Sequence, residues 1–249
     1  MANAKTMNAK SLKVLLVGDA GTYKTRLAAT FPQPHFVDFD DGMLSVRGQD
    51  VIYITIGRKE TTDEDFLALF PTKKAKMRAF VKGQALLEHW ANTLTKDQTL
   101  VLDSFTFYTD AALEHVLALN NQPTPRIQDW GAAQKLLEGT LEELNKLPCN
   151  VVVIAHRDMK QDQETGAISY VPQTIGKLAK KMPAYFDEVW RTNTKLKKEG
   201  GSDVEEFYIE TIKGRREDGK TRLNLPSKIV NPTYESIIQI MKEKTNGRN

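Results

Sequence analysis

Residues 18–25, Gly-Asp-Ala-Gly-Thr-Tyr-Lys-Thr, combine glycines, a lysine and a hydroxyl at a spacing suited to binding a phosphate chain. Gly18 and Lys24 stand six positions apart, as in the pattern G-x-x-x-x-G-K-[ST]. In that chemistry backbone N–H groups surround the β-phosphate, Lys24 reaches the β- and γ-phosphates, and the Thr25 hydroxyl ligates Mg²⁺. The residues that we expect to bind a nucleotide are Gly18, Asp19, Ala20, Gly21, Thr22, Tyr23, Lys24, Thr25 and Arg26.

Tyr23 occupies the position at which this pattern has its second glycine. Glycine allows left-handed backbone angles, which cost a residue with a Cβ about 1–2 kcal/mol. A plain strand, turn and helix is therefore an alternative for this stretch taken alone. We expect Gly21 to take over part of the glycine's role. Tyr23 is predicted to keep helical or bridge-region angles, with its N–H toward the phosphates and its ring pointing outward.

Two carboxylates follow short apolar runs elsewhere in the chain. The run TLVLDS, residues 99–104, places Asp103 at the end of a predicted strand, where a carboxylate can hold Mg²⁺ together with the Thr25 hydroxyl. The run HFVDFD, residues 35–40, ends in Asp40, a candidate to orient or deprotonate an attacking water. An Asp-Asp-Gly bend without chemistry is the alternative for Asp40. The order of the motifs favours a nucleotide site with Thr25 and Asp103 as metal ligands.

Alternating strands and helices must position these residues. We predict helices at 25–31, 61–94, 105–119 and 131–147, and strands at 13–17, 35–40, 51–56, 99–104, 150–155, 188–192 and 206–212. This order predicts an α/β fold, a mostly parallel twisted sheet with helices on both faces. The last two strands, joined by a hairpin turn, would add antiparallel edge strands. We expect a flexible segment at 1–11 and a single domain over 12–249.

The composition sets limits on the class of protein. The chain has 249 residues, 40% hydrophobic and 27% charged, with a net charge of +3, which does not indicate a general polyanion-binding protein. Its single cysteine, Cys149, excludes an internal disulfide and suits a reducing compartment. An apolar run of the ~20 residues needed to span a bilayer is absent from the sequence. These features predict a cytoplasmic protein without a membrane association.

The order of the motifs resembles the RecA-like P-loop ATPase core, and most closely the short phage nucleotide-binding proteins associated with single-strand annealing. The resemblance covers roughly residues 12–225 and implies ATP and Mg²⁺ as cofactors.

The resemblance also implies roles for individual residues. It places Asp40 where the family usually has a glutamate that activates water. His156, at the end of VVVIAH, matches a polar residue that senses the γ-phosphate. Lys213 and Arg215 resemble a basic pair that reaches a neighbouring subunit's γ-phosphate, which implies a homo-oligomer. The catalytic candidates are Lys24, Asp40, Asp103, His156, Lys213 and Arg215.

The resemblance also implies single-stranded DNA as a partner, and a single-strand-binding protein as a further one. Two long polar stretches, 120–130 and 157–176, match the family's DNA-facing loops, in which cations meet the backbone and aromatic rings stack on bases. The candidates are Arg126, Trp130, Arg157, Lys160, Tyr170 and Lys177. A solvated surface is the alternative for each side chain.

The sequence thus predicts an ATPase, phage-encoded and acting in the host cytoplasm, that binds single-stranded DNA and promotes annealing or recombination. Two other functions remain open. One is a P-loop phosphotransferase acting on a small molecule. The other is a non-hydrolysing nucleotide switch, which Tyr23 and the short Asp40 side chain would favour.

Overall fold

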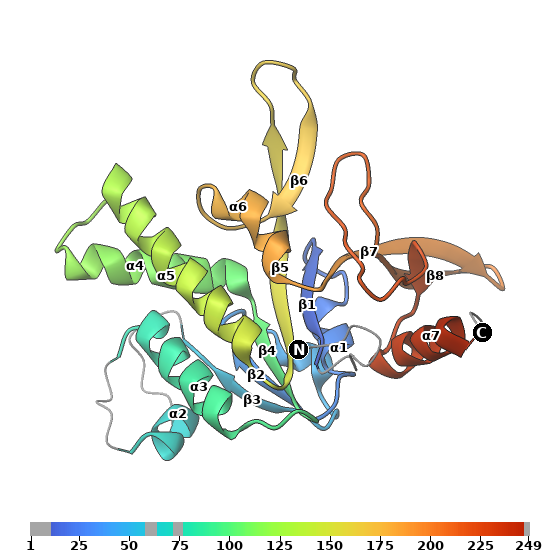
Figure 1. Cartoon of the computed structure of the whole chain (residues 1–249), viewed down its shortest axis with the longest axis horizontal. Coiled ribbons are helices and arrows are strands. Elements are labelled where there is room, and N and C mark those ends of the chain that lie inside the picture. The colour runs from blue at the N-terminus through green and yellow to red at the C-terminus, as the bar shows by residue number, and fades with distance from the viewer. Residues whose placement is uncertain (1–10, 58–63, 72–76, 247–249) are drawn as a thin grey trace, which may run out of the picture.

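The computed structural model describes residues 11–57, 64–71 and 77–246. Strands of this part form a nine-stranded sheet in the order β3-β2-β4-β5-β1-β7-β8-β9, with β6 paired to β5 off this path (Figure 1). The strands are β1 (Lys13–Gly18), β2 (Pro34–Asp38), β3 (Ile52–Thr55), β4 (Thr99–Asp103), β5 (Asn150–Gln161), β6 (Ile168–Pro172), β7 (Glu188–Glu199), β8 (Ser202–Glu210) and β9 (Lys228–Val230). The helices are α1 (Lys24–Ala28), α2 (Glu64–Leu69), α3 (Ala79–Thr93), α4 (Phe105–Leu119), α5 (Ile127–Lys146), α6 (Leu178–Lys181) and α7 (Tyr234–Asn246), with 3-10 turns η2 (Met43–Val46) and η3 (Met182–Tyr185).

The centre of the sheet is parallel, from β3 through β2, β4, β5 and β1 to β7. Along β1, Leu15 and Val17 belong to one apolar cluster, and Val14 and Leu16 belong to another on the opposite face. This alternation follows from the two-residue period of a strand that is buried on both faces. The first cluster lies under α3, α4 and α5, and the second includes residues of α1 and α7. The predicted α/β fold is confirmed.

Antiparallel strands extend the sheet beyond this centre. β8 pairs with β7 and β9 with β8, whereas β6 pairs with the outer half of β5. In Figure 1 the β5–β6 hairpin projects at the top and the β7–β8 hairpin extends to the right. The β7–β8 strands are longer than the predicted 188–192 and 206–212, because Gly200 and Gly201, with φ of 59° and 88°, reverse the chain within two residues.

The predicted single helix at 61–94 was wrong. The described residues of this range form two helices, α2 and α3, and the prediction for 61–63 and 72–76 falls outside them. Pro71 gives the physical reason, because a proline disfavours helical angles at the residue before it, here Phe70. The Arg78 N-cap has extended angles, and α3 begins only at the next residue.

Both predicted DNA-facing loops are shorter than expected. α5 begins at Ile127 rather than at 131, because the Asp129 carboxylate accepts the backbone N–H of Arg126 at 2.9 Å and so stabilises an earlier start of the helix. The stretch 157–176 was predicted to be a loop, but half of it is the outer part of β5 and all of β6. This hairpin is largely exposed, so its strands lack the apolar alternation by which a half-buried strand is recognised.

The segment predicted to be flexible, 1–11, lies outside the described residues except for its last position. None of the described helices has the length and apolar character required to cross a membrane.

Candidate functional site

Strand register brings the predicted residues to one edge of the sheet. Gly18 at the end of β1 pairs with His156 in β5, and Asp38 at the end of β2 pairs with Asp103 at the end of β4. Parallel strands place their carboxyl ends on the same edge, where α/β proteins bind ligands. A pocket of about 380 Å³ opens there, lined by Ala20, Gly21, Thr22, Tyr23, Lys24, Thr25, Arg26, Asp40, Gly42, Ser45, Asp103, His156 and Glu205.

The loop between β1 and α1 wraps around Lys24. The buried ammonium group of Lys24 donates hydrogen bonds to the backbone oxygens of Gly18, at 3.0 Å, and Asp19, at 2.6 Å. Burial lowers the pKa of Lys24, and the carboxylates of Asp103, Asp40 and Asp19 oppose this shift. The loop therefore holds a cation at the centre of an acidic pocket.

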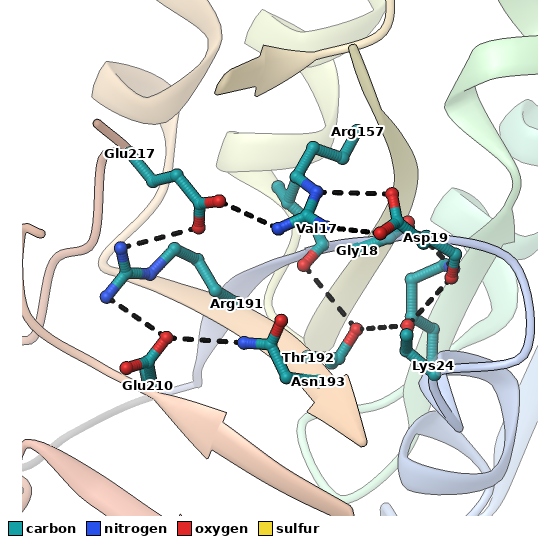
Figure 2. A network of polar contacts seen from close by, with 11 residues as sticks. Val17, Gly18, Asp19, Lys24, Arg157, Arg191, Thr192, Asn193, Glu210 and Glu217 are labelled. Carbon is teal, nitrogen blue, oxygen red and sulfur yellow. Dashed lines mark hydrogen bonds and ion pairs between the residues drawn. The ribbon is translucent and has the colours of Figure 1, made fainter. Parts of the chain in front are cut away.

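Gly18 is required by close packing against β7. A Cβ at this position would lie 2.6 Å from both the Thr22 hydroxyl and the Thr192 backbone oxygen. The hydroxyls of Thr22 and Thr192 are 2.7 Å apart. The Thr192 hydroxyl also reaches the backbone oxygen of Val17 at 3.5 Å (Figure 2). Sequence reasoning missed Thr192. The one feature of the sequence that could have pointed to Thr192 is its hydroxyl at the end of the predicted strand 188–192.

Tyr23 does not have the predicted helical or bridge-region angles. Its φ of 61° and ψ of 19° are left-handed, and Gly21 also has a positive φ, 78°. The loop thus needs left-handed backbone at the position of the missing glycine, at a cost of about 1–2 kcal/mol for a tyrosine. The Tyr23 ring stacks on Phe207 of β8 with centroids 4.8 Å apart, and its hydroxyl donates to Glu205 at 2.9 Å. The sequence analysis did not predict the contacts of Tyr23 with Phe207 and Glu205.

One corner of the pocket has the donor set for a divalent cation. The Thr25 hydroxyl donates to one Asp103 oxygen at 2.6 Å, whereas the other Asp103 oxygen and the Ser104 hydroxyl are buried without a partner among the described residues. Burial raises the pKa of Asp103 to about 7, and the nearby carboxylates of Asp38 and Asp40 add to this rise. A hard cation prefers such oxygens, and its charge would offset the cost of burying the carboxylate. The residues present therefore fit Mg²⁺.

Asp40 and His156 face each other across the pocket. The His156 Nε2 atom lies 3.4 Å from an Asp40 oxygen, with both side chains partly exposed. The strand predicted to reach Asp40 ends at Asp38, so Asp40 stands in a bend. Asp38 shapes this bend, because one of its buried oxygens accepts the N–H of Asp40 at 3.0 Å and that of Gly42 at 3.4 Å. Sequence reasoning did not assign a role to Asp38.

A network of alternating charges leads from the loop to β7 and β8 (Figure 2). Arg157 donates to both carboxylate oxygens of Asp19 and, at 2.7 Å, to Glu217. Glu217 lies 3.4 Å from the Arg191 guanidinium, which lies 3.5 Å from Glu210. The sequence pointed to Arg157 as a DNA contact, and the structure places it between two carboxylates. The sequence did not predict the ion pairs of Arg191 with Glu210 and Glu217, because these residues come from separate segments and form no local motif.

The structure does not bring Lys213 and Arg215 into the pocket. Both follow the end of β8 on an exposed segment, and the Lys213 ammonium group lies 3.5 Å from Asp218. A role in a neighbouring subunit's site stays a prediction.

The DNA candidates lie on α5, on the β5–β6 hairpin and beside α6. Arg126 pairs with Asp129 and Lys160 with Asp158. The Tyr170 ring lies under the Arg157 guanidinium at 4.7 Å, and Trp130 and Lys177 are exposed. Their DNA role is not tested by this geometry and stays a prediction.

The Asp103→Asn variant should lose most of the Mg²⁺ dependence of nucleotide binding. Removing the carboxylate charge should weaken Mg-ADP binding about tenfold, while binding of Mg²⁺-free ADP should be unchanged or tighter, because one repulsive charge near the phosphates is gone. Titration calorimetry with ADP in Mg²⁺ or in EDTA measures both affinities. An equal loss of affinity under the two conditions would contradict the metal assignment.

Comparison with known proteins gives a family match. A family model described as an AAA domain matches residues 10–223, a range that contains every residue lining the pocket. The search of curated proteins found no match. Among solved structures, a prototypical ATPase from the type III secretion system of pathogenic bacteria matches with 14% identity and a TM-score of 0.44. The match covers 73% of this chain and 52% of that ATPase, so the chain spans about half its length.

Proposed function

Because the chain belongs to the AAA domain family, we propose that it binds Mg-ATP at residues 18–25, hydrolyses it, and couples the reaction to single-stranded DNA. The observation that carries the ATPase part is the convergence of Lys24, the Thr25–Asp103 pair and Asp40 on one pocket. These are the cation, the metal ligands and the base that phosphoryl transfer to water requires.

Each of these pocket residues has a defined role in this proposal. Lys24 exchanges its backbone partners for the β- and γ-phosphates and offsets their charge. Thr25 and Asp103 would hold Mg²⁺, which would supply positive charge to offset that of the phosphates. Asp40 orients the attacking water and accepts its proton. His156, 3.4 Å from Asp40, keeps that carboxylate in place and contacts the γ-phosphate.

The DNA part of the proposal rests on the resemblance to phage annealing proteins and on the cations and the aromatic ring that the β5–β6 hairpin and the segment beside it carry. β5 runs without interruption from His156 into the β5–β6 hairpin, which carries Lys160 on β5 and Tyr170 on β6. The Tyr170 N–H donates to the backbone oxygen of Arg216 at 2.6 Å, so the exposed segment with Lys213 and Arg215 lies along this hairpin. Single strands bind where cations and aromatic rings alternate.

The proposal also includes three partners: single-stranded DNA, a single-strand-binding protein and further copies of this chain. The β5–β6 hairpin, with Lys160 and Tyr170, would contact DNA and so promote annealing or recombination, together with a single-strand-binding protein. In a homo-oligomer, Lys213 and Arg215 of one subunit would complete the pocket of the next.

A non-hydrolysing switch is the second candidate, favoured by Asp40, which is one methylene shorter than the glutamate usual in RecA-like proteins. Such a protein would bind ATP with the same residues but would not turn it over.

Measuring ADP release with and without single-stranded DNA, across a salt series, separates these functions. We expect turnover that rises with DNA and DNA binding that weakens steeply with salt, because phosphate contacts release counterions. Heparin serves as a control for a general polyanion effect. DNA-independent turnover without salt-sensitive DNA binding would remove the DNA part, and tight ATP binding without turnover would favour the switch.

A further inference from the structure

The β7–β8 hairpin contacts two consecutive residues of the phosphate-binding loop. Thr192 of β7 contacts the Thr22 hydroxyl at 2.7 Å, and that hydroxyl also donates to the Asp19 backbone oxygen at 2.8 Å. On β8, Phe207 and Glu205 contact the ring and the hydroxyl of Tyr23. The hairpin lies more than 160 positions later in the sequence than the loop, so tertiary contacts bring the two together.

The backbone conformation of Tyr23 is one that needs support from such contacts. A residue with a Cβ prefers right-handed or extended angles, so an unsupported tyrosine would leave the left-handed region that Tyr23 occupies at φ 61°. Leaving it would turn the peptide groups on either side of Tyr23, including the one that leads to Lys24, where α1 begins. A glycine at this position would have no such preference.

The side-chain contacts of Tyr23 are suited to holding that conformation. The rings of Tyr23 and Phe207 are nearly parallel, 17° apart, and the Tyr23 hydroxyl bonds Glu205 at 2.9 Å. The Arg26 guanidinium lies over the same ring at 4.9 Å. Three side chains thus hold the ring and the hydroxyl of Tyr23, and two of these side chains come from β8.

We propose that the β7–β8 hairpin is a structural part of the nucleotide site, with Phe207 and Glu205 as positioning residues that keep Tyr23 left-handed and so replace the glycine of the phosphate loop. This inference rests on nucleotide binding at residues 18–25, as proposed above. Nucleotide affinity then depends on the hairpin, although Phe207 does not line the pocket.

The positioning role of Phe207 can be tested by comparing Phe207→Ala in the wild type with the same substitution in a Tyr23→Gly variant. In the wild-type background, Phe207→Ala should weaken Mg-ADP binding three- to tenfold in titration calorimetry, roughly the range that one aromatic pair supplies. In the Tyr23→Gly background the same substitution should have no effect, because glycine holds the left-handed angles unaided. Tyr23→Gly alone, which restores the residue of the usual pattern, gives the reference affinity for this second background.

Tyr208→Ala is the matched control. It removes an aromatic ring from the same strand, but that ring packs under the Lys228 ammonium at 3.5 Å rather than on the loop. We expect unchanged Mg-ADP affinity, and thermal unfolding of every variant shows whether the fold is retained. An equal loss for Phe207→Ala in both backgrounds, or no loss in either, would overturn the positioning role while leaving nucleotide binding intact. A wild-type chain without Mg-ADP binding would overturn the proposed function and this inference with it.

Discussion

Replacing Lys24 by alanine should reduce Mg-ATP affinity about 100-fold or more. The Lys24 ammonium group is buried and is the cation around which the loop closes, with Asp103, Asp40 and Asp19 as the nearby negative charges. Its loss leaves these carboxylates to repel the phosphates. Removing one partner from a buried charge cluster costs about 3 kcal/mol or more, which corresponds to about 100-fold in affinity.

Lys146→Ala provides the control for this change. Lys146 is exposed at the end of α5, where it pairs with Glu143, and its removal should leave affinity unchanged. Titration calorimetry with Mg-ATP measures both variants, and circular dichroism confirms that they are folded. Affinity that survives the Lys24→Ala substitution would show that residues 18–25 do not bind the phosphates.

Replacing Asp40 by asparagine should slow ATP hydrolysis by about 100-fold or more while leaving Mg-ATP affinity within a few-fold of the wild type. General base catalysis typically contributes about 10²–10⁴ in rate, and the amide cannot accept the proton of water. The amide can still lie beside His156 Nε2, now 3.4 Å from the Asp40 oxygen, so the pocket should keep its shape. Single-turnover hydrolysis measures the rate of the chemical step apart from product release.

Asp41→Asn is a close control for the Asp40 variant. Asp41 is the next residue, is exposed, and has a φ of 57°, an angle that asparagine tolerates well. The Asp41 variant should hydrolyse ATP at the wild-type rate. Equal slowing by the two substitutions would point to the bend as a whole, and no slowing by either would exclude Asp40 as the base.

The parallel core and the centre of the site could be predicted because their signals are local. An apolar strand, a loop with glycine and lysine, and a second strand ending in Asp103 are each readable within a few residues. Their order along the chain then predicts that Thr25 and Asp103 meet, and the structure places the two side chains 2.6 Å apart.

The conformation of Tyr23 could not be predicted in the same way. Local preference favours right-handed angles, and the residues that override it lie on β8, 182 positions later for Glu205. Arg157 is a similar case, because its partners Asp19 and Glu217 are 138 and 60 positions away. The β5–β6 hairpin was missed for a different reason, since its residues 157–172 are mostly exposed or half-buried and carry no periodic apolar pattern.

The length of β5 also has a mechanical consequence. This one strand holds His156 in the pocket and continues to Gln161 on the projecting hairpin (Figure 1). Five residues of strand span about 17 Å at ~3.3 Å each, so a tilt of about 10° at His156 would carry Gln161 through about 3 Å. A small rotation of β5 at the pocket would therefore produce a larger displacement at the outer end of the β5–β6 hairpin.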